Sequence, residues 1–378
     1  KGRQRRAVAV QRAMLTVPEY NINAKQREFA GHTGRVFDVD ISNDGLCVTA
    51  SEDGTAKIWR LADGRLEGEV AQSQTKDEVL RVAWAPPIVR DAAGASLLAV
   101  AGADGFCNLW RGDDWSAPKS LQRLDHGGDQ VYGCAWSSCG DAYGAWLLTA
   151  AGAAVRTWDV NVGKTIKQWS YQEPRGDQAY VFDVQPAPRD ADDALRATIA
   201  CAVSDGTARV RDVRLNYDAR VLRAPGDSKV TAVGWLGGTA VASCYGDGCC
   251  RVWDARTWRL LGRLKGAHAS PCYGAAKTDG FVASWAAEGL AFWSCEDALR
   301  KADATKKATA PITDSSGNAV PLFQCAFSSS NIVVCGGAGG KGDAIVPSVF
   351  VYDLESRKRG RNDEDAAGEK RPRESFFV

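Results

Sequence analysis

Histidine and methionine are almost absent from this chain, which has three histidines and one methionine among 378 residues. Histidine is the commonest general acid or base of enzymes, so few residues are available for that chemistry. The twelve cysteines are scattered and include no Cys-x-x-Cys pair, so the ligand spacing typical of a zinc site is missing. We therefore expect no catalytic residue, no bound metal and no cofactor.

Long apolar stretches are also missing. No run approaches the roughly 18 apolar residues that a membrane-spanning helix requires. The basic segment 1–17 contains an apolar part that is too short and too interrupted for a secretory signal. We expect no membrane partner, and we expect the cysteines to be buried free thiols in a reducing compartment.

Charge of one sign is not in excess, because 47 basic residues face 46 acidic ones. Five of the basic residues fall within positions 1–13, so the middle of the chain, 14–354, carries a net negative charge. Binding to nucleic acid phosphates requires clustered positive charge. Direct nucleic-acid binding by this middle part is therefore not expected.

A short β-type unit recurs seven times along the chain. The apolar cores begin 42 to 52 residues apart, at Val36, Val79, Val131, Val181, Val230, Cys272 and Leu322. Each core is followed by a second apolar run, a tight turn and a third run. Asp-Gly pairs at 53–54, 104–105, 205–206 and 247–248 are typical of hairpin turns that need a positive φ. The pattern predicts an all-β array of small antiparallel sheets.

The third run of most units ends in an aromatic residue. These residues are Trp59, Trp110, Trp158, Trp253, Trp293 and Tyr352, whereas the fourth unit has Arg211. The recurrence resembles the WD-repeat family over nearly all of 14–354. The resemblance implies a seven-bladed β-propeller of four-stranded antiparallel blades. We expect three regions: a disordered basic arm at 1–13, the propeller at 14–354, and a disordered charged tail at 355–378.

The resemblance also implies a structural role for the histidines. In such blades a histidine binds the aspartate of the turn, and a serine or threonine of the strand binds the tryptophan. In the first unit these residues are His32, Asp53 and Trp59, with either Ser51 or Thr49 as the hydroxyl residue. Both hydroxyls share one strand face, so the choice between them stays open.

The other two histidines occupy the same place in their units. His126 and His268 precede the first core residue by five and four positions, and His32 does so by four. Trp158 and Trp293 are their expected aromatic partners. All three histidines are thus assigned to the framework, because buried polar groups need hydrogen-bond partners.

The last unit has no obvious fourth strand of its own. An open sheet edge would expose unpaired backbone groups. We expect the segment MLTVPEY, 14–20, to pair with the last blade and to close the ring.

One motif is similar to a dinucleotide-binding loop. GAGGKG, 337–342, matches Gly-x-Gly-x-x-Gly, but such a loop needs a helix directly after it. The following residues, DAIVPSVFVYDL, read as a strand. We interpret the motif as an extended hairpin turn.

Three long loops interrupt the repeat, at 85–96, 185–196 and 295–321. Loops on a rigid scaffold often carry recognition, although drift in length explains them equally well. We expect the third to begin with a short helix.

The tail contains two basic clusters separated by acidic residues. They consist of Arg357, Lys358, Arg359 and Arg361, and of Lys370, Arg371 and Arg373. The pattern resembles a bipartite nuclear localisation signal, which binds an import receptor. The alternative is a solvated charged tail. We expect a protein of the nucleus, with the cytoplasm as a second compartment.

These observations favour a non-catalytic scaffold that binds other proteins within a complex. Residues just before each first strand are expected near one mouth of the central channel, followed by charged residues inside the strands. The expected contact residues are Arg35, Glu78, Gln130, Tyr180 and Lys229, together with Asp38, Arg81 and Asp183.

Two alternatives remain open. One is a substrate receptor of a cullin-type ubiquitin ligase, because VASCYGDGCCRVWDAR, 241–256, ends in Trp-Asp-x-Arg. Arg256 would then contact the ligase adaptor. The other is a subunit of an RNA-processing or chromatin assembly, which rests on the tail alone.

Overall fold

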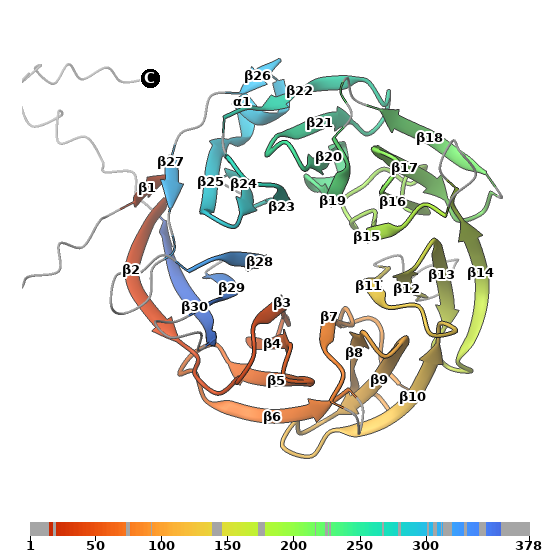
Figure 1. Ribbon diagram of the computed structural model, residues 1–378, viewed down its shortest axis with the longest axis vertical. Helices are drawn as coiled ribbons and strands as arrows, with labels where there is room; N and C mark the ends of the chain where they lie inside the picture. The colour runs from red at the N-terminus through yellow and green to blue at the C-terminus, as the bar shows by residue number, and fades with distance from the viewer. Residues whose placement is uncertain are drawn as a thin grey trace, which may run out of the picture.

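The computed structural model describes residues 15–356 apart from short gaps, and the described residues form seven β-sheets (Figure 1). The gaps are 18–19, 73–75, 92, 138–145, 173–177, 216, 224–225, 227, 267, 279–280, 301, 305–307, 311, 313–319, 329–330 and 340–344. The predicted arm, 1–13, and the basic clusters of the predicted tail lie outside the described residues. The region boundaries predicted from the sequence therefore stay predictions.

The first four sheets each contain four strands that follow one another along the chain. The first sheet consists of β3 (Val36–Ile41), β4 (Leu46–Ser51), β5 (Thr55–Arg60) and β6 (Leu66–Ala71). The second consists of β7 (Val79–Trp84), β8 (Ser96–Gly102), β9 (Phe106–Gly112) and β10 (Lys119–Asp125). The third consists of β11 (Val131–Trp136), β12 (Trp146–Ala151), β13 (Ala154–Asp159) and β14 (Lys164–Ser170). The fourth consists of β15 (Val181–Pro186), β16 (Thr198–Val203), β17 (Thr207–Asp212) and β18 (Asp218–Arg223).

The fifth and sixth sheets share the long insert 295–321. The fifth contains β19 (Val230–Trp235), β20 (Ala240–Tyr245), β21 (Cys250–Asp254) and β22 (Leu260–Leu264). The sixth contains β23 (Cys272–Lys277), β24 (Phe281–Ala286) and β25 (Gly289–Ser294). The insert begins with the expected short helix, α1 (Cys295–Arg300). Its next strand, β26 (Asp303–Ala304), runs parallel to β22, and β27 (Ala308–Ala310) pairs with β25.

The seventh sheet joins both ends of the chain. It contains β28 (Leu322–Phe327), β29 (Asn331–Gly339) and β30 (Ile345–Ser356), and β2 (Tyr20–Glu28) pairs antiparallel with β30. The predicted segment, 14–20, was thus placed too early, because residues 20–28 form the strand on β30. The edge strand β1 (Leu15–Val17) pairs only with β2 in the described sheet. Pro18 follows β1 in the sequence, and a proline cannot donate a hydrogen bond within a sheet.

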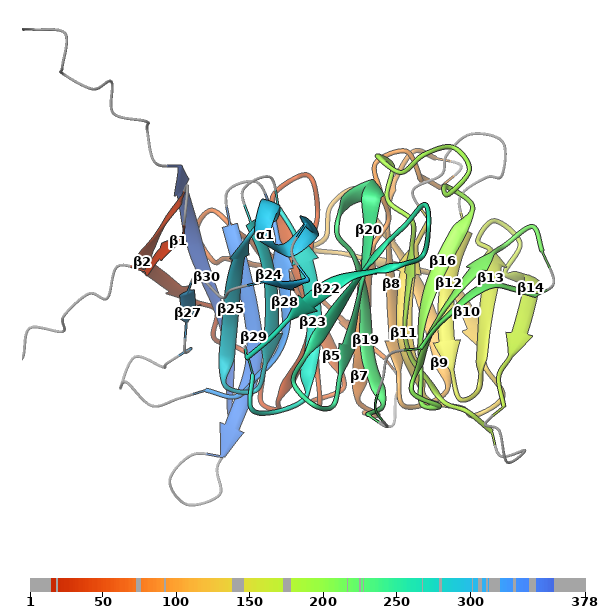
Figure 2. The same ribbon diagram turned by 90° about the horizontal axis from the view of Figure 1, so that it is seen from above.

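The sheets pack face to face around a central axis, which points toward the viewer in Figure 1 and runs up the page in Figure 2. Strands such as β16, β20 and β24 are buried along their whole length. Their residues are apolar on both faces because each face covers a neighbouring sheet. One apolar cluster, for example, joins Val48 and Ile58 of the first sheet to Val82 and Leu98 of the second. The architecture is a β-propeller of small antiparallel sheets.

The first strand of each sheet lies nearest the axis. These innermost strands, β3, β7, β11, β15, β19, β23 and β28, contact one another in that order, and β28 contacts β3 (Figure 1). The Asp-Gly turns have the expected backbone, since Gly54 and Gly105 have φ angles of 80° and 79°. Among the described residues, no helix is long and apolar enough to span a membrane.

Phe29 joins the first sheet to the seventh. Its side chain is 3% exposed, and its ring stacks on Trp59 with centroids 5.4 Å apart. Its amide donates a hydrogen bond to the carbonyl of Val349, 2.9 Å away. Phe29 also packs in an apolar cluster with Val349 and Val351. Phe29 therefore links the first sheet to the seventh, where the two meet in the ring.

We expect Phe29→Ala to lower the free energy of unfolding by about 3–5 kcal/mol, the cost of truncating a buried phenylalanine. Urea unfolding followed by tryptophan fluorescence measures this value. Leu66→Ala, at a side chain that is 45% exposed, is the matched control and should change it by less than about 0.5 kcal/mol. Equal losses in the two variants would contradict the role assigned to Phe29.

Candidate functional site

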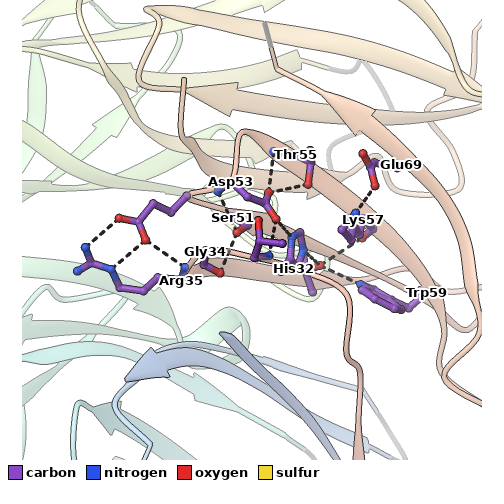
Figure 3. A network of polar contacts seen from close by, with 12 residues as sticks. His32, Gly34, Arg35, Ser51, Asp53, Thr55, Lys57, Trp59 and Glu69 are labelled. Carbon is purple, nitrogen blue, oxygen red and sulfur yellow. Dashed lines mark hydrogen bonds and ion pairs between the residues drawn. The ribbon is translucent and has the colours of Figure 1, made fainter. Parts of the chain in front are cut away.

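The first sheet contains a polar network built around His32 (Figure 3). His32 Nδ1 lies 2.9 Å from Asp53 Oδ2, and Nε2 lies 2.8 Å from Thr49 Oγ1. An ionised carboxylate can only accept, so Nδ1 carries the proton that it donates to Asp53. In the neutral ring, Nε2 then accepts from the Thr49 hydroxyl. Trp59 Nε1 donates to the same hydroxyl oxygen over 2.9 Å.

The structure decides between the two hydroxyl residues in favour of Thr49. Ser51 Oγ instead donates to the carbonyl of Gly34 over 3.1 Å and accepts from the amide of Asp53 over 3.2 Å. Thr49 is two residues from Cys47, which is the cross-strand partner of Trp59. The tryptophan therefore reaches Thr49, while Ser51 lies nearer the turn.

Asp53 is the charged centre of this network. Burial raises the pKa of Asp53, but hydrogen bonds from His32 and Thr55 outweigh burial and hold the pKa below its usual value. The Thr55 hydroxyl donates over 2.6 Å, and the amide of Thr33 donates over 3.0 Å. Asp53 is therefore ionised at neutral pH and fixes the orientation of His32, which is 7% exposed.

His126 occupies a similar network in the third sheet. Its Nε2 lies 2.8 Å from Thr149 Oγ1, and Trp158 Nε1 donates to that oxygen over 2.8 Å. The turn has Ala153 in place of an aspartate, and Nδ1 pairs with the carbonyl of Leu124 over 3.1 Å. Burial lowers the pKa of His126 to about 4, so the ring is neutral at physiological pH.

His268 is also placed in its framework, but its network is shorter than expected. Its Nε2 lies 2.7 Å from Ser284 Oγ, and Nδ1 lies 3.7 Å from Glu288 Oε1. Trp293 Nε1, expected to join this network, has no hydrogen-bond partner among the described residues. All three histidines are therefore held by hydrogen bonds within the sheets.

The second sheet has a substitute that sequence reasoning missed. Gln72 Nε2 donates to Asp104 Oδ1 and to the carbonyl of Phe106, each over 2.9 Å. It thus binds the turn aspartate as His32 does in the first sheet. Gln72 lies seven residues before Val79, whereas His32 lies four before Val36, so the spacing concealed the equivalence.

The residues predicted around the mouth lie where each innermost strand begins. Arg35, Gln130, Tyr180 and Lys229 are exposed, and Glu78 is half-buried. They come directly before β3, β11, β15, β19 and β7 respectively. Arg35 forms a two-pronged ion pair with Glu52, with distances of 2.9 Å and 3.1 Å (Figure 3).

A set of aromatic residues on the innermost strands, beside this mouth, was not predicted. The second residue of five innermost strands is aromatic and half-buried: Phe37, Tyr132, Phe182, Tyr273 and Phe323. Phe37 packs edge-on against Phe323 with centroids 5.8 Å apart, and Tyr132 packs against Phe182 at 6.5 Å. We call these five residues the aromatic belt. The repeat alignment could have shown it, because all five share one position in their units.

The charged strand residues predicted as contacts instead join neighbouring sheets. Asp38 and Asp183 are 6% and 8% exposed. Asp38 accepts from the amide of Val82 over 2.8 Å, and Asp183 accepts from the amide of Val233 over 3.1 Å. Arg81 donates to the carbonyl of Tyr132 over 2.6 Å. Burial raises the pKa of both carboxyl groups, opposed by the charge of Arg81.

A cavity of about 580 Å³ occupies the axis beyond these residues. Its wall includes Asp40, Lys277 and four tryptophans, Trp84, Trp136, Trp235 and Trp285. Burial raises the pKa of Asp40 to about 7, although backbone amides of Trp84 and Ile41 donate to it. None of the described residues that line the cavity is a histidine.

Arg256, which the ligase-receptor alternative requires, forms an ion pair within the chain. Its Nε donates to Asp192 Oδ2 over 2.7 Å, and Nη2 lies 3.3 Å from Oδ1. Asp192 belongs to the loop 185–196, where Ala191 and Leu195 pack against Ala255. This loop is thus part of the packing between two sheets.

The described part of the glycine-rich motif 337–342 lies in a hairpin, as predicted. Strands β29 and β30 pair antiparallel up to Gly339 and Ile345, and residues 340–342 lie outside the described residues. The strand after the motif agrees with the sequence interpretation.

Thr49→Val tests the hydroxyl link. Valine has the same shape but leaves the N–H of Trp59 and Nε2 of His32 without their partner, so we expect a loss of about 1–3 kcal/mol in unfolding free energy. The fold accepts valine here, because Val100 holds this position in the second sheet. In urea unfolding, the exposed Thr165→Val should stay within about 0.5 kcal/mol. A Thr49→Val variant as stable as that control would contradict the link.

The depressed pKa of His126 predicts a pH-dependent stability. Between about pH 6.5 and pH 4 the unfolded chain binds a proton that the folded protein does not. The contribution is therefore complete above pH 6.5 and is lost as the pH falls towards 4. We expect the stability advantage over His126→Gln to shrink by about 3 kcal/mol across this range in urea unfolding. A constant difference would contradict a neutral buried His126.

Comparison with protein families found one family whose model matches two segments of the chain. The family described as WD domain, G-beta repeat matches residues 23–60 and 218–254. Each match begins in the strand that precedes a sheet along the chain, β2 or β18, and continues through the first three strands of that sheet. No curated protein matches the chain. The two matches and the ring of antiparallel sheets together support a protein of the WD-repeat β-propeller family.

Proposed function

We propose that this protein is a non-catalytic scaffold that binds another protein at the mouth where the innermost strands begin. The observation that carries the proposal is the aromatic belt, half-buried at the second position of five of these strands. The exposed Arg35, Gln130, Tyr180 and Lys229 come directly before four of the innermost strands.

The composition of this surface is that of a protein interface. Such interfaces combine a centre rich in tyrosine, phenylalanine and arginine with a polar, solvent-exposed rim. Aromatic side chains bury a large area and lose little conformational entropy on binding, so they contribute most of the binding energy. Tyr180 is 51% exposed and precedes the belt residue Phe182 by two positions in sequence.

The scaffold role also agrees with the state of the histidines. A histidine can act as a general base only where its ring reaches the substrate. His32 and His126 are 7% and 1% exposed, and each binds a threonine hydroxyl. Their positions favour bracing of the sheets over catalysis.

The tail supports a proposed nuclear location. Its two basic clusters, 357–361 and 370–373, lie outside the described residues, and the proposal rests on their sequence. An import receptor would bind them, and the partner at the mouth would belong to a nuclear assembly such as one for RNA processing or chromatin. The ligase-receptor alternative is less favoured, because it rests on the Trp-Asp-x-Arg ending alone.

Affinity capture of the intact protein from its own cells, followed by mass spectrometry, tests the binding surface. We expect Tyr180→Ser to reduce recovery of the main partner by about tenfold or more, because loss of an exposed aromatic contact beside the belt costs at least about 1.4 kcal/mol. Tyr217→Ser is the matched control, since Tyr217 is 64% exposed between β17 and β18. Equal recovery with both variants would contradict binding at this mouth.

A further inference from the structure

Three cysteines meet between the fifth and sixth sheets. Cys244 and Cys250 are cross-strand partners on β20 and β21, and Cys272 is the first residue of β23. The Sγ atoms of Cys244 and Cys250 lie 3.2 Å apart, and those of Cys250 and Cys272 lie 3.1 Å apart. All three sulfurs lie within 4.8 Å of one another. The side chains are at most 1% exposed, so these thiols are enclosed by the two sheets.

The repeat provides an internal comparison for this cluster. At the junction of the first and second sheets the equivalent positions hold the pair Ala50 and Ala56, with Val79. At the junction of the fourth and fifth sheets they hold Ala202 and Ala208, with Val230. Two alanines and a valine therefore satisfy the packing at this position.

Thiols at all three positions are not required by the fold. Cysteine packs as a small apolar residue, but its sulfur also binds soft metal ions. The junction of the second and third sheets has one cysteine, Cys107, opposite Ala101. The fifth and sixth sheets thus place three sulfurs together, whereas two of the compared junctions hold only hydrocarbon and the third holds one cysteine. Sequence spacing could not show this, because Cys272 comes from a different unit.

We propose that Cys244, Cys250 and Cys272 form a buried binding site for one Cu(I) ion. Thiolate ligands select soft ions such as Cu(I) and Zn(II). Zn(II) in structural sites takes four ligands, whereas the group of potential ligands in the described residues contains three. A three-coordinate soft ion fits this set, and the enclosed position leaves no place for an open coordination site.

The geometry requires a small adjustment on binding. Metal–thiolate bonds of about 2.3 Å around a trigonal ion place the sulfurs about 4 Å apart. Two of the present separations are 3.1 Å and 3.2 Å, so the sulfurs move apart by somewhat less than 1 Å. Rotation of the cysteine side chains supplies this movement. Each thiol that binds as a thiolate releases its proton to solvent, and the copper keeps its oxidation state.

The test is a Cu(I) titration of the reduced full-length chain under anaerobic conditions, with bicinchoninate as the competing chelator. We expect the protein to retain one Cu(I) and to develop the ultraviolet absorption of copper–thiolate bonds. The variant Cys244→Ala/Cys250→Ala/Cys272→Val carries the residues of the sister junctions, so we expect it to fold. Its apparent affinity should fall more than about 100-fold, beyond the loss that follows removal of an outer-shell group.

A second variant controls for thiol loss in general. Cys107 and Cys134 are both buried, and their thiols lie within hydrogen-bonding reach across another junction. Cys107→Ala/Cys134→Ala should retain the single Cu(I) with unchanged affinity. Circular dichroism checks the fold of each variant. If the triple variant does not fold, Cys272→Val alone should show the 100-fold loss.

Three results would overturn the proposal. The first is equal Cu(I) retention by the wild type and the folded Cys272 variant. The second is a parallel titration in which Zn(II) is retained and Cu(I) is not. The third is a protein that binds neither ion and forms a disulfide in air, detected as a mass lower by two hydrogens.

Discussion

Burial of both faces of each sheet against its neighbours is the constraint on which the whole structure depends. The strands of one sheet cannot bury their apolar side chains alone, so Val48 and Ile58 need Val82 and Leu98 of the next sheet. Continuing this packing around an axis produces a ring, and the ring places all innermost strands side by side. The mouth with its aromatic belt and the thiol cluster are both consequences of this arrangement. Polar networks such as that of His32 then fix the turns at the edges of the sheets.

Much of this architecture could be predicted because the repeat is regular. The apolar cores begin at the first residues of the innermost strands, and the Asp-Gly turns have the positive φ that their residues favour. The histidines lie in the framework, where each has the hydrogen-bond partners that a buried imidazole needs. The sequence could not show which hydroxyl accepts the hydrogen bond of Trp59. Thr49 and Ser51 lie on one strand face, and only the position of Trp59 decides between them.

Other features depend on contacts between units that are far apart in sequence. Gln72 takes the role of the histidine although it lies at a different distance from its first strand. The strand β26 of the insert pairs with β22 of the fifth sheet. The strand on β30 comes from residues 20–28, because pairing register is set by the partner strand and not by the local pattern alone. Asp38 and Asp183 were expected at a surface, yet they accept hydrogen bonds from the neighbouring innermost strands. A sequence shows that such residues are charged but not which strand lies opposite them.

The central claim is that the mouth beside the aromatic belt is the surface that binds another protein. Hydrogen–deuterium exchange of the intact protein, with and without its captured partner, tests it most directly. The account predicts slower exchange on binding at the starts of β3, β11, β15 and β28, with outer strands such as β6 and β14 unchanged. Slower exchange confined to those outer strands would contradict it.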